Sequence, residues 1–249
     1  MKKLSLHISP CPNDTFAFDA IINHRLDHDF DLAVEYKDIE ELNEGVLAGV
    51  PDISKISYSV YPKIADRYLL LESGSALGRG NGQLLVRRAG ESGQIRTVAT
   101  PGLNTTANAL LMRYFPGVEV TPMLFSTIAE AVERGVTDAG VLIHEGRFVY
   151  ERRNLELVAD LGKLWEEETA LPLPLGAIVI KRDWTMLCGS SLSSCLPILC
   201  AMPLPIVMFL AHSLRSTRKS WMMMSLTSIS HYLSINTPFR WVKRAQKRL

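Results

Sequence analysis

The chain has 249 residues, which is enough for one large domain or for two lobes with a buried core. Its formal net charge of +1 argues against a general attraction to nucleic acid or to anionic membranes. The first residues, MKKLSLHISP, place two lysines before only a short apolar run, so we expect no signal peptide and a cytoplasmic protein.

The first 183 residues predict alternating strands and helices. Asn13 is the expected N-cap of the first helix, and Gly135 the expected stop of the last. In chain order we expect strands at 4–9, 30–38 and 52–54, one ending near residue 100, and others at 139–143 and 175–183, with helices at 14–22, 39–47, 58–64, 105–114 and 129–134. This order implies an α/β fold with mostly parallel sheets.

The chain further predicts two lobes. Residues 72–88, ESGSALGRGNGQLLVRR, hold four glycines before a strand, which suits a crossover between lobes. We expect lobe I at 1–87, lobe II and a return strand at 88–183, and a separate tail at 184–249. In open α/β sheets a ligand binds at the carboxyl ends of the strands, so we expect its site in the cleft between the lobes.

Two segments predict helix N-termini that could bind an anion. SPCPNDTF places Asn13 and Asp14 after a strand and a proline-rich turn. GLNTTANALL places Asn104, Thr105 and Thr106 behind a glycine turn. Free backbone N–H groups at such starts favour anions, although these side chains also suit ordinary helix caps. Two such ends, one in each lobe, favour a ligand with an anionic group held between them.

Two further segments hold chemically useful side chains. In DISKISY, Lys55 and Ser57 follow a short strand and could hold a carboxylate, although a surface lysine is the simpler interpretation. In LIHEGRF, His144 follows an apolar strand and suits general base catalysis, with Glu145 and Arg147 close by to orient a ligand or form an ion pair. The alternative is a histidine that only hydrogen-bonds the backbone where a strand ends.

Other patterns argue against nucleotide and metal sites. GRGNG lacks the spacing of a dinucleotide loop, and no P-loop lysine and serine follow it. Three of the four cysteines lie in the tail at Cys188, Cys195 and Cys200, and their spacing matches no common zinc pattern. We expect neither a metal nor a disulfide framework.

Six motifs, taken together in their order and at their separations, resemble the 1,4-dihydroxy-6-naphthoate synthase family of the futalosine route to menaquinone. They are SPCPNDTF, the KIS of DISKISY, SGSALGRG, NTTAN, IHEGRF and LPLPLGAI. The resemblance covers residues 1–183 nearly end to end. It implies a two-lobed fold like that of the type II periplasmic binding proteins. The related chorismate dehydratases share this fold but are not expected to carry the full set of motifs.

The resemblance also implies the chemistry. The family converts cyclic dehypoxanthine futalosine into 1,4-dihydroxy-6-naphthoate and dihydroxyacetone, without a metal or an organic cofactor. His144 aligns with the family's proton acceptor. Lys55, Ile56 and Ser57, together with Thr105 and Thr106, align with its substrate-holding segments. The implied partner is a small-molecule substrate, with neither nucleic acid nor membrane, and the oligomeric state is left open.

The tail differs from the rest of the chain. Residues 1–183 hold 19 Lys or Arg and 26 Asp or Glu, whereas residues 184–249 hold eight Lys or Arg and no acid. No charged residue lies between Trp184 and Leu214, which would allow a membrane helix, but several prolines and serines weaken that interpretation.

We favour a displaced reading frame near Asp183. In the shifted frame, Trp221 followed by three methionines encodes three consecutive aspartates, and Trp241-Val242 encodes a glycine. The acids missing from the tail would then lie in another frame, and the tail would be non-native or disordered. The leading function is therefore a lyase. The alternatives are a non-catalytic binding protein of the same fold, an inactive truncated product, and a tail-anchored membrane protein.

Overall fold

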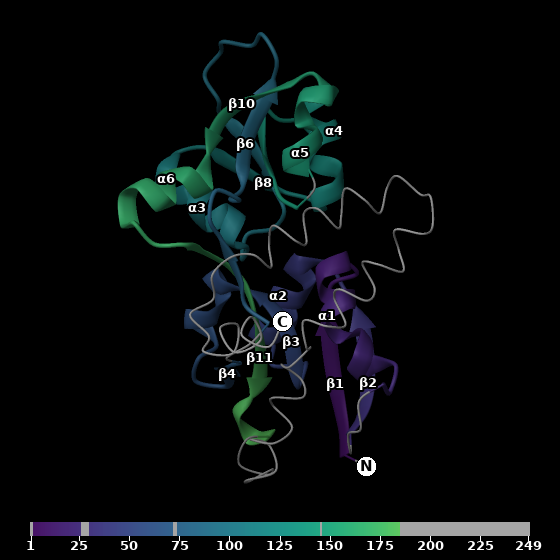
Figure 1. Cartoon of the computed structure of the whole chain (residues 1–249). Helices are drawn as coiled ribbons and strands as arrows, with labels where there is room; N and C mark the ends of the chain where they lie inside the picture. The colour runs from purple at the N-terminus through teal and green to yellow at the C-terminus, as the bar shows by residue number, and fades with distance from the viewer. Residues whose placement is uncertain (1, 26–29, 72–73, 145, 185–249) are drawn as a thin grey trace, which may run out of the picture.

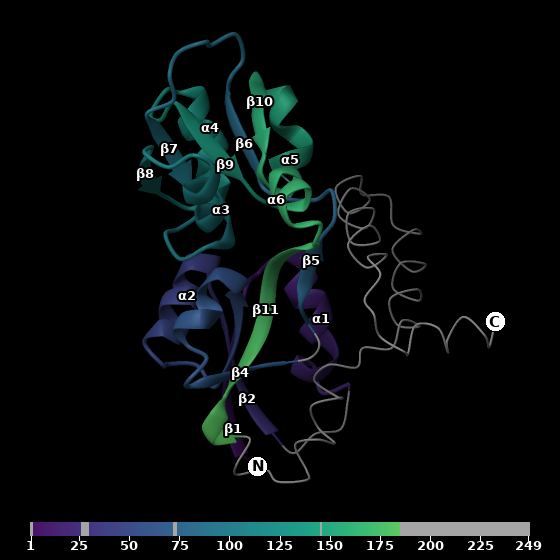
Figure 2. The same cartoon turned by 90° about the vertical axis from the view of Figure 1, so that its left-hand side faces the viewer.

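The computed structural model describes residues 2–25, 30–71, 74–144 and 146–184. They form two lobes, one above the other in Figures 1 and 2. The lower lobe is built from both ends of the described chain, and the upper lobe from the segment between them. Each lobe contains one sheet with helices packed against it. The predicted two-lobed α/β architecture is confirmed.

The sheet of the lower lobe has the strand order β2-β1-β3-β11-β4, and β5 also pairs with β11. Its strands are β1 (Lys2–Ile8), β2 (Phe30–Tyr36), β3 (Ile53–Ser57), β4 (Tyr68–Leu70), β5 (Ala76–Gly78) and β11 (Leu173–Lys181). Its helices are α1 (Pro12–Ile22), α2 (Ile39–Leu47) and the 3₁₀ helix η1 (Tyr58–Lys63). β1 runs parallel to β2 and β3, whereas β11 returns antiparallel between β3 and β4.

Successive side chains of β11 supply two different cores, because neighbouring residues of a strand point to opposite faces of the sheet. Ile178 and Ile180 pack in the cluster that contains Phe18 of α1. Val179 packs in the cluster that contains Val46 of α2. The lower lobe is therefore a three-layer structure, and β11 is apolar on both faces, as expected for a central strand.

The sheet of the upper lobe has the order β10-β6-β9-β7-β8. Its strands are β6 (Leu84–Arg88), β7 (Thr97–Thr100), β8 (Glu119–Pro122), β9 (Ala139–Leu142) and β10 (Leu155–Asp160). Its helices are α3 (Thr106–Tyr114), α4 (Ile128–Glu133), α5 (Gly146–Val149) and α6 (Leu161–Thr169), with 3₁₀ helices η2 (Phe125–Thr127) and η3 (Tyr150–Arg153).

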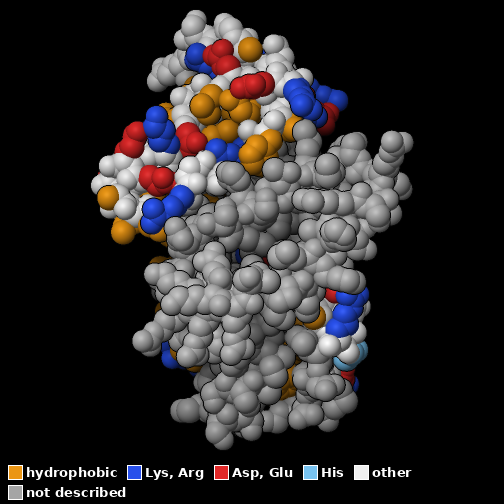
Figure 3. Space-filling view, in the orientation of Figure 1, with side chains coloured by type: hydrophobic (Ala, Val, Ile, Leu, Met, Phe, Trp, Pro, Cys, Tyr) orange, Lys and Arg blue, Asp and Glu red, His pale blue; other side chains and the backbone are white. Residues whose placement is uncertain are grey.

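The sheet of the upper lobe, like that of the lower lobe, packs apolar side chains on both of its faces. Leu85 of β6 packs with Leu110 of α3 and Leu161 of α6, whereas Val86 packs with Val132 of α4 on the other face. On the outside, the part of the upper lobe visible in Figure 3 carries acidic, basic and apolar side chains next to one another. The coloured side chains visible there therefore form no large patch of one charge sign.

The chain enters the upper lobe between β5 and β6 and returns between α6 and β11. The entering passage touches the first turn of α6 where Gly82 meets Gly162: a Cβ atom on Gly82 would lie 2.2 Å from the Cα atom of Gly162. Two backbones meet here with no room for a side chain. The expected lobe boundary at 87/88 falls at the end of β6, so the passage itself lies a few residues earlier, between Gly78 and Leu84.

Two expectations about local structure were wrong. The sheets are mixed, with four parallel pairings among the nine between described strands, because β11 and β6 enter their sheets in the opposite direction to their neighbours. Asn13 is not the N-cap of α1, because the helix already begins at Pro12, with Cys11 in the N-cap position. Proline suits the first helical turn, since its fixed φ is helical and its missing N–H needs no partner there.

The expectations for the tail concern residues 185–249, which lie outside the described residues. Trp184 is described, and it packs against the apolar core between α1 and the lower sheet. In the described part of the chain, no helix is both long and apolar enough to cross a membrane.

Candidate functional site

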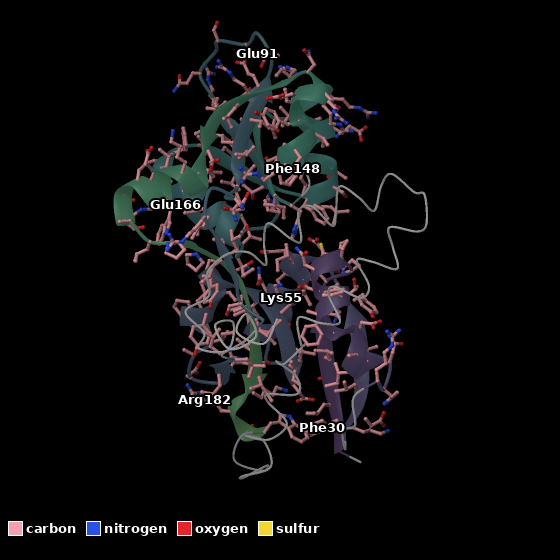
Figure 4. The ribbon with its side chains drawn as sticks, in the orientation of Figure 1. Phe30, Lys55, Glu91, Phe148, Glu166 and Arg182 are labelled. Atoms are coloured by element: carbon pink, nitrogen blue, oxygen red, sulfur yellow. The ribbon has the colours of Figure 1, made fainter. Side chains whose placement is uncertain are left out.

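A pocket lies between the lobes, with walls from both of them. Strands β1, β3 and β9 end at its wall, and the N-termini of α1 and α3 both reach it. Its volume is about 990 Å³, including the space at its open mouth. Figure 4 shows Lys55 in the lower lobe close to the junction of the lobes, whereas Phe30 and Arg182 lie at the far end of that lobe.

A buried ion pair forms part of the lower wall. Lys55 Nζ lies 2.5 Å from Asp14 Oδ1, and Ser9 Oγ donates to Asp14 Oδ2 at 2.6 Å. Burial alone would raise the pKa of the Asp14 carboxyl, but the charge of Lys55 and the hydrogen bonds from Lys55 and Ser9 outweigh it, so the pKa is lowered. Lys55 is thus held by a partner in the pocket wall, not free on the surface.

Ser57 lies beside Lys55 in the same wall, and a buried asparagine fixes it. The Ser57 backbone N–H donates to Asn43 Oδ1 at 2.9 Å, and Asn43 Nδ2 donates to Ser57 Oγ at 3.1 Å. Asn43 comes from α2 and is fully buried. Helix α2 therefore orients the end of β3, where Ile56 and Ser57 border the pocket.

The upper wall contains the start of α3. Thr105 caps this helix, since its Oγ1 accepts from the Asn108 backbone N–H at 3.2 Å and donates to the Gly102 carbonyl at 2.7 Å. Thr106 Oγ1 donates to the carbonyl of Leu175 in β11 at 3.0 Å. Both hydroxyls thus hold the helix start against the pocket, where its first N–H groups favour an anion.

His144 follows β9 in a left-handed backbone conformation, with φ of 52°. The Phe125 ring meets the imidazole edge to face, with centroids 5.5 Å apart. His144 Nε2 also lies 3.9 Å from Cys11 Sγ, which belongs to the opposite lobe. Non-glycine residues with positive φ are uncommon, and they gather at functional sites. The imidazole is thus presented to the pocket where both lobes contact it.

The contact with His144 changes the chemistry of Cys11. Burial tends to raise the pKa of the Cys11 thiol, but the hydrogen bond and charge of His144, with a further hydrogen bond from Ser9, outweigh it and lower the pKa. Asp38, also in the lower wall, has a raised pKa, mainly because of burial. The site therefore contains ionisable groups with pKa values moved in opposite directions, a pattern typical of functional sites.

Arg147 extends from α5 toward the passage between the lobes. Its guanidinium donates to the carbonyls of Gly80 and Gly82 and lies 3.5 Å from Asp160 Oδ2. It therefore ties the segment after His144 to the crossover, and part of it borders the pocket. Among the described residues, no cluster of three or more His, Cys, Asp or Glu is arranged to hold a metal ion.

The structure places most of the candidate residues in this one pocket. The pocket wall includes the following candidates: Asn13, Asp14, Lys55, Ile56, Ser57, Thr105, Thr106, His144 and Arg147. Asn104 lies outside that wall and contacts the lower lobe instead. Glu145 lies outside the described residues.

Sequence reasoning missed several residues of the site, among them Cys11, Asp38 and Asn43. Cys11 stands in the turn between β1 and α1, in a motif noted only for its helix start. Asp38 precedes the helix at 39–47, and its position at the carboxyl edge of β2 was the available signal. Asn43 lies between Leu42 and Val46 on the buried face of α2. A polar side chain on such a face needs a partner, which indicates a bond to another element.

The sequence is similar to known proteins over most of its described part. A family model described as menaquinone biosynthesis matches residues 4–195. A 1,4-dihydroxy-6-naphthoate synthase of Thermus thermophilus is 45% identical over 184 residues, which cover 74% of this chain and 68% of that protein. The synthase of Streptomyces coelicolor is 42% identical over 187 residues, covering 72% and 66%. The alignments thus span about two thirds of each relative.

Solved structures agree on the architecture. Protein AF1704 from Archaeoglobus fulgidus superposes with a TM-score of 0.73 and 32% identity, covering 79% of this chain and 75% of that one. The alkanesulfonate-binding protein SsuA from Xanthomonas axonopodis pv. citri superposes with a TM-score of 0.60 and 12% identity, covering 80% and 72%. The second likeness concerns the fold alone, and it confirms the periplasmic-binding-protein-like fold expected from the sequence.

Proposed function

The chain belongs to the menaquinone biosynthesis family, and from this premise we propose that it cleaves cyclic dehypoxanthine futalosine into 1,4-dihydroxy-6-naphthoate and dihydroxyacetone. In this proposal the chain is a carbon–carbon lyase with His144 as proton acceptor. Its main support is that His144, Lys55 and the start of α3 border one pocket in a chain 45% and 42% identical to two synthases.

The proposed base suits the reaction. A lyase that releases a hydroxyketone while a ring becomes aromatic must take a proton from one position and return one to the departing fragment. His144 stands at the pocket wall, and a histidine changes its charge near neutral pH. A placed general base typically accelerates a reaction by about 100- to 10,000-fold. The same imidazole, once protonated, can return the proton.

The remaining wall suits the rest of the substrate. Naphthoate bears a carboxylate, and the Lys55 ammonium and the N-terminus of α3 both favour an anion at the pocket. We therefore propose that these groups hold the carboxylate while His144 faces the carbon that loses its proton. Two lobes around the substrate would exclude water and fix its orientation.

Turnover by the purified chain tests the proposal. The chain is incubated with cyclic dehypoxanthine futalosine, and both products are followed by liquid chromatography and mass spectrometry. We expect both products from the natural chain, and a loss of about 100- to 10,000-fold in kcat for His144→Gln. Circular dichroism controls for folding. Turnover by His144→Gln at the natural rate would remove His144 from its proposed role.

A second candidate is a binding protein without catalysis, favoured by the likeness in fold to SsuA. It predicts tight binding of a small molecule without turnover, and no effect of His144→Ala on affinity. Isothermal titration with the substrate and with 1,4-dihydroxy-6-naphthoate separates the two candidates, since a lyase consumes the substrate and a binding protein does not.

We also propose that the reading frame of the gene is displaced near Asp183. Support comes from the 66 residues that follow, which contain no acid although the first 183 contain all 26. Sequencing the gene across codons 175–195 tests this. A single base added or lost would establish the displacement, and an unbroken frame shared with independent isolates would contradict it.

A further inference from the structure

Three side chains of the lower lobe hold Asn104 of the upper lobe at every polar atom that it offers. Its backbone N–H and its Nδ2 donate to the Glu40 carboxylate, at 3.0 Å and 2.9 Å from Oε1. Its carbonyl accepts from Ser59 Oγ at 2.6 Å, and its Oδ1 accepts from Lys63 Nζ at 3.1 Å. We call this set of contacts, from Glu40, Ser59 and Lys63 to Asn104, the interlobe clamp.

A neighbouring glycine makes the approach of Glu40 possible. A Cβ atom on Gly102 would lie 2.4 Å from the carboxyl carbon of Glu40. The φ angle of Gly102 is also +142°, a conformation that residues with side chains rarely adopt. The space for the Glu40 carboxylate therefore depends on the absence of a side chain at position 102, independently of the hydrogen bonds.

The clamp joins the start of α2, beside the lower wall of the pocket, to the segment before α3, beside the upper wall. Glu40 is in the first turn of α2, next to Asp38 and Ile39 of the pocket wall. Asn104 directly precedes Thr105, the cap of α3. None of the four clamp residues belongs to the pocket wall itself. The clamp therefore fixes the distance between two walls without occupying the space of a ligand.

We propose that Asn104 is a positioning residue, and that the interlobe clamp holds the N-terminus of α3 at its working distance from the lower wall before substrate arrives. The role in catalysis rests on the proposed function, whereas the role in lobe spacing does not. A preformed spacing lowers the entropy lost when substrate orders the two lobes. The clamp should thus strengthen binding, while the chemical step at His144 stays the same once substrate is bound.

The contacts of the clamp set the expected change in the Michaelis constant when the clamp is removed. Hydrogen bonds to a charged group are stronger than neutral ones, and Glu40 accepts from both nitrogens of Asn104. Glu40 and Asn104 are both half-buried, so in a variant water can replace part of the lost hydrogen bonding. We expect the Michaelis constant to rise roughly tenfold in the absence of the clamp, with kcat within about twofold of the natural value.

Three variants of the full chain test the proposal. Glu40→Ala removes the acceptor of both Asn104 nitrogens, and Asn104→Ala removes the side-chain contacts while leaving α2 unchanged. Glu44→Ala is the matched control, since Glu44 is an exposed acid of the same helix. The measurements are the radius of gyration by small-angle X-ray scattering without ligand, the melting temperature, and steady-state kinetics with cyclic dehypoxanthine futalosine.

We expect both clamp variants, but not Glu44→Ala, to show a larger radius of gyration and a raised KM with kcat retained. A purely structural role predicts a lower melting temperature with the radius of gyration and KM unchanged, and that result would overturn the proposal. If the natural chain shows no turnover, the proposed function fails instead. The scattering still decides whether the clamp sets the spacing of the lobes.

Discussion

Lys55 and Asp14 come from different elements of the lower lobe, and their charged atoms lie 2.5 Å apart in the wall of the pocket. Only 7% of the Asp14 side chain and 15% of the Lys55 side chain are exposed. Burying a charge without a partner lowers the stability of the fold, so each of the two residues offsets the cost of burying the other. The Lys55 ammonium in the pocket wall is thus fixed by an acid of α1.

Replacing Asp14 should therefore destabilise the protein. We expect Asp14→Asn to lower the free energy of unfolding by about 2–3 kcal/mol, because the Lys55 ammonium then lacks its counter-charge. The matched control is Asp19→Asn, also on α1, whose pair with Arg25 is largely exposed and should matter by less than about 1 kcal/mol. Urea unfolding followed by circular dichroism measures both. Equal losses for the two variants would contradict the importance of burial.

Low pH should weaken the ion pair between Asp14 and Lys55. The pKa of Asp14 is lowered in the folded chain, so its contribution to stability is present above its unfolded pKa of about 3.9 and is lost as the pH falls through the folded value. We expect the difference in unfolding free energy between the natural chain and Asp14→Asn to be constant from pH 6 to 5 and to shrink below about pH 4. A difference that persists at pH 2 would show that Asp14 acts through something other than its charge.

The thiol of Cys11 should react faster than an ordinary cysteine. His144 and Ser9 lower its pKa against the opposing effect of burial, so more thiolate is present at neutral pH. We expect iodoacetamide to alkylate Cys11 more slowly in His144→Gln than in the natural chain at pH 7. Peptide mass spectrometry follows Cys11 separately from the cysteines of the tail. The same rate in both proteins would show that the imidazole does not activate the thiol.

The contact of Gly82 with Gly162 should not tolerate a methyl group. A Cβ atom on Gly162 would lie 2.4 Å from the Cα atom of Gly82, and backbone cannot yield as a flexible side chain does. We expect Gly162→Ala to cost about 3 kcal/mol of unfolding free energy. Gly93→Ala is the control, since its added Cβ meets nothing within 4 Å. Thermal unfolding of both variants measures the difference.

The sequence predicted the elements whose signals are local. The helix at 39–47 is a case in point: apolar spacing and an acidic start define it, and α2 has these bounds. The strand of β11 was visible as an apolar run, but its direction was not, because no local pattern tells which neighbours a returning strand will meet. Strand β10 was missed, since it follows a helical stretch and carries acids at Glu156 and Asp160.

Prediction of the site residues was also limited to what local sequence patterns indicate. The residues at strand ends and helix starts were nominated because their chemistry is readable in the sequence, as for Lys55 and His144. The contact between Cys11 and His144 spans 133 positions and depends on how the lobes meet. Asn104 was nominated as support for a ligand, yet its partners lie 41 to 64 positions earlier in the chain. Such distances are decided by tertiary structure, which a single sequence does not display.

The position of β11 has a consequence for synthesis on the ribosome, where a chain emerges from its N-terminus. β11 lies between β3 and β4, so the lower sheet stays divided until residue 181 has emerged. The five strands of the upper sheet are all present once Asp160 has emerged. The lobe that begins second can therefore be completed first, and the lower lobe must keep its five earlier strands available until β11 arrives.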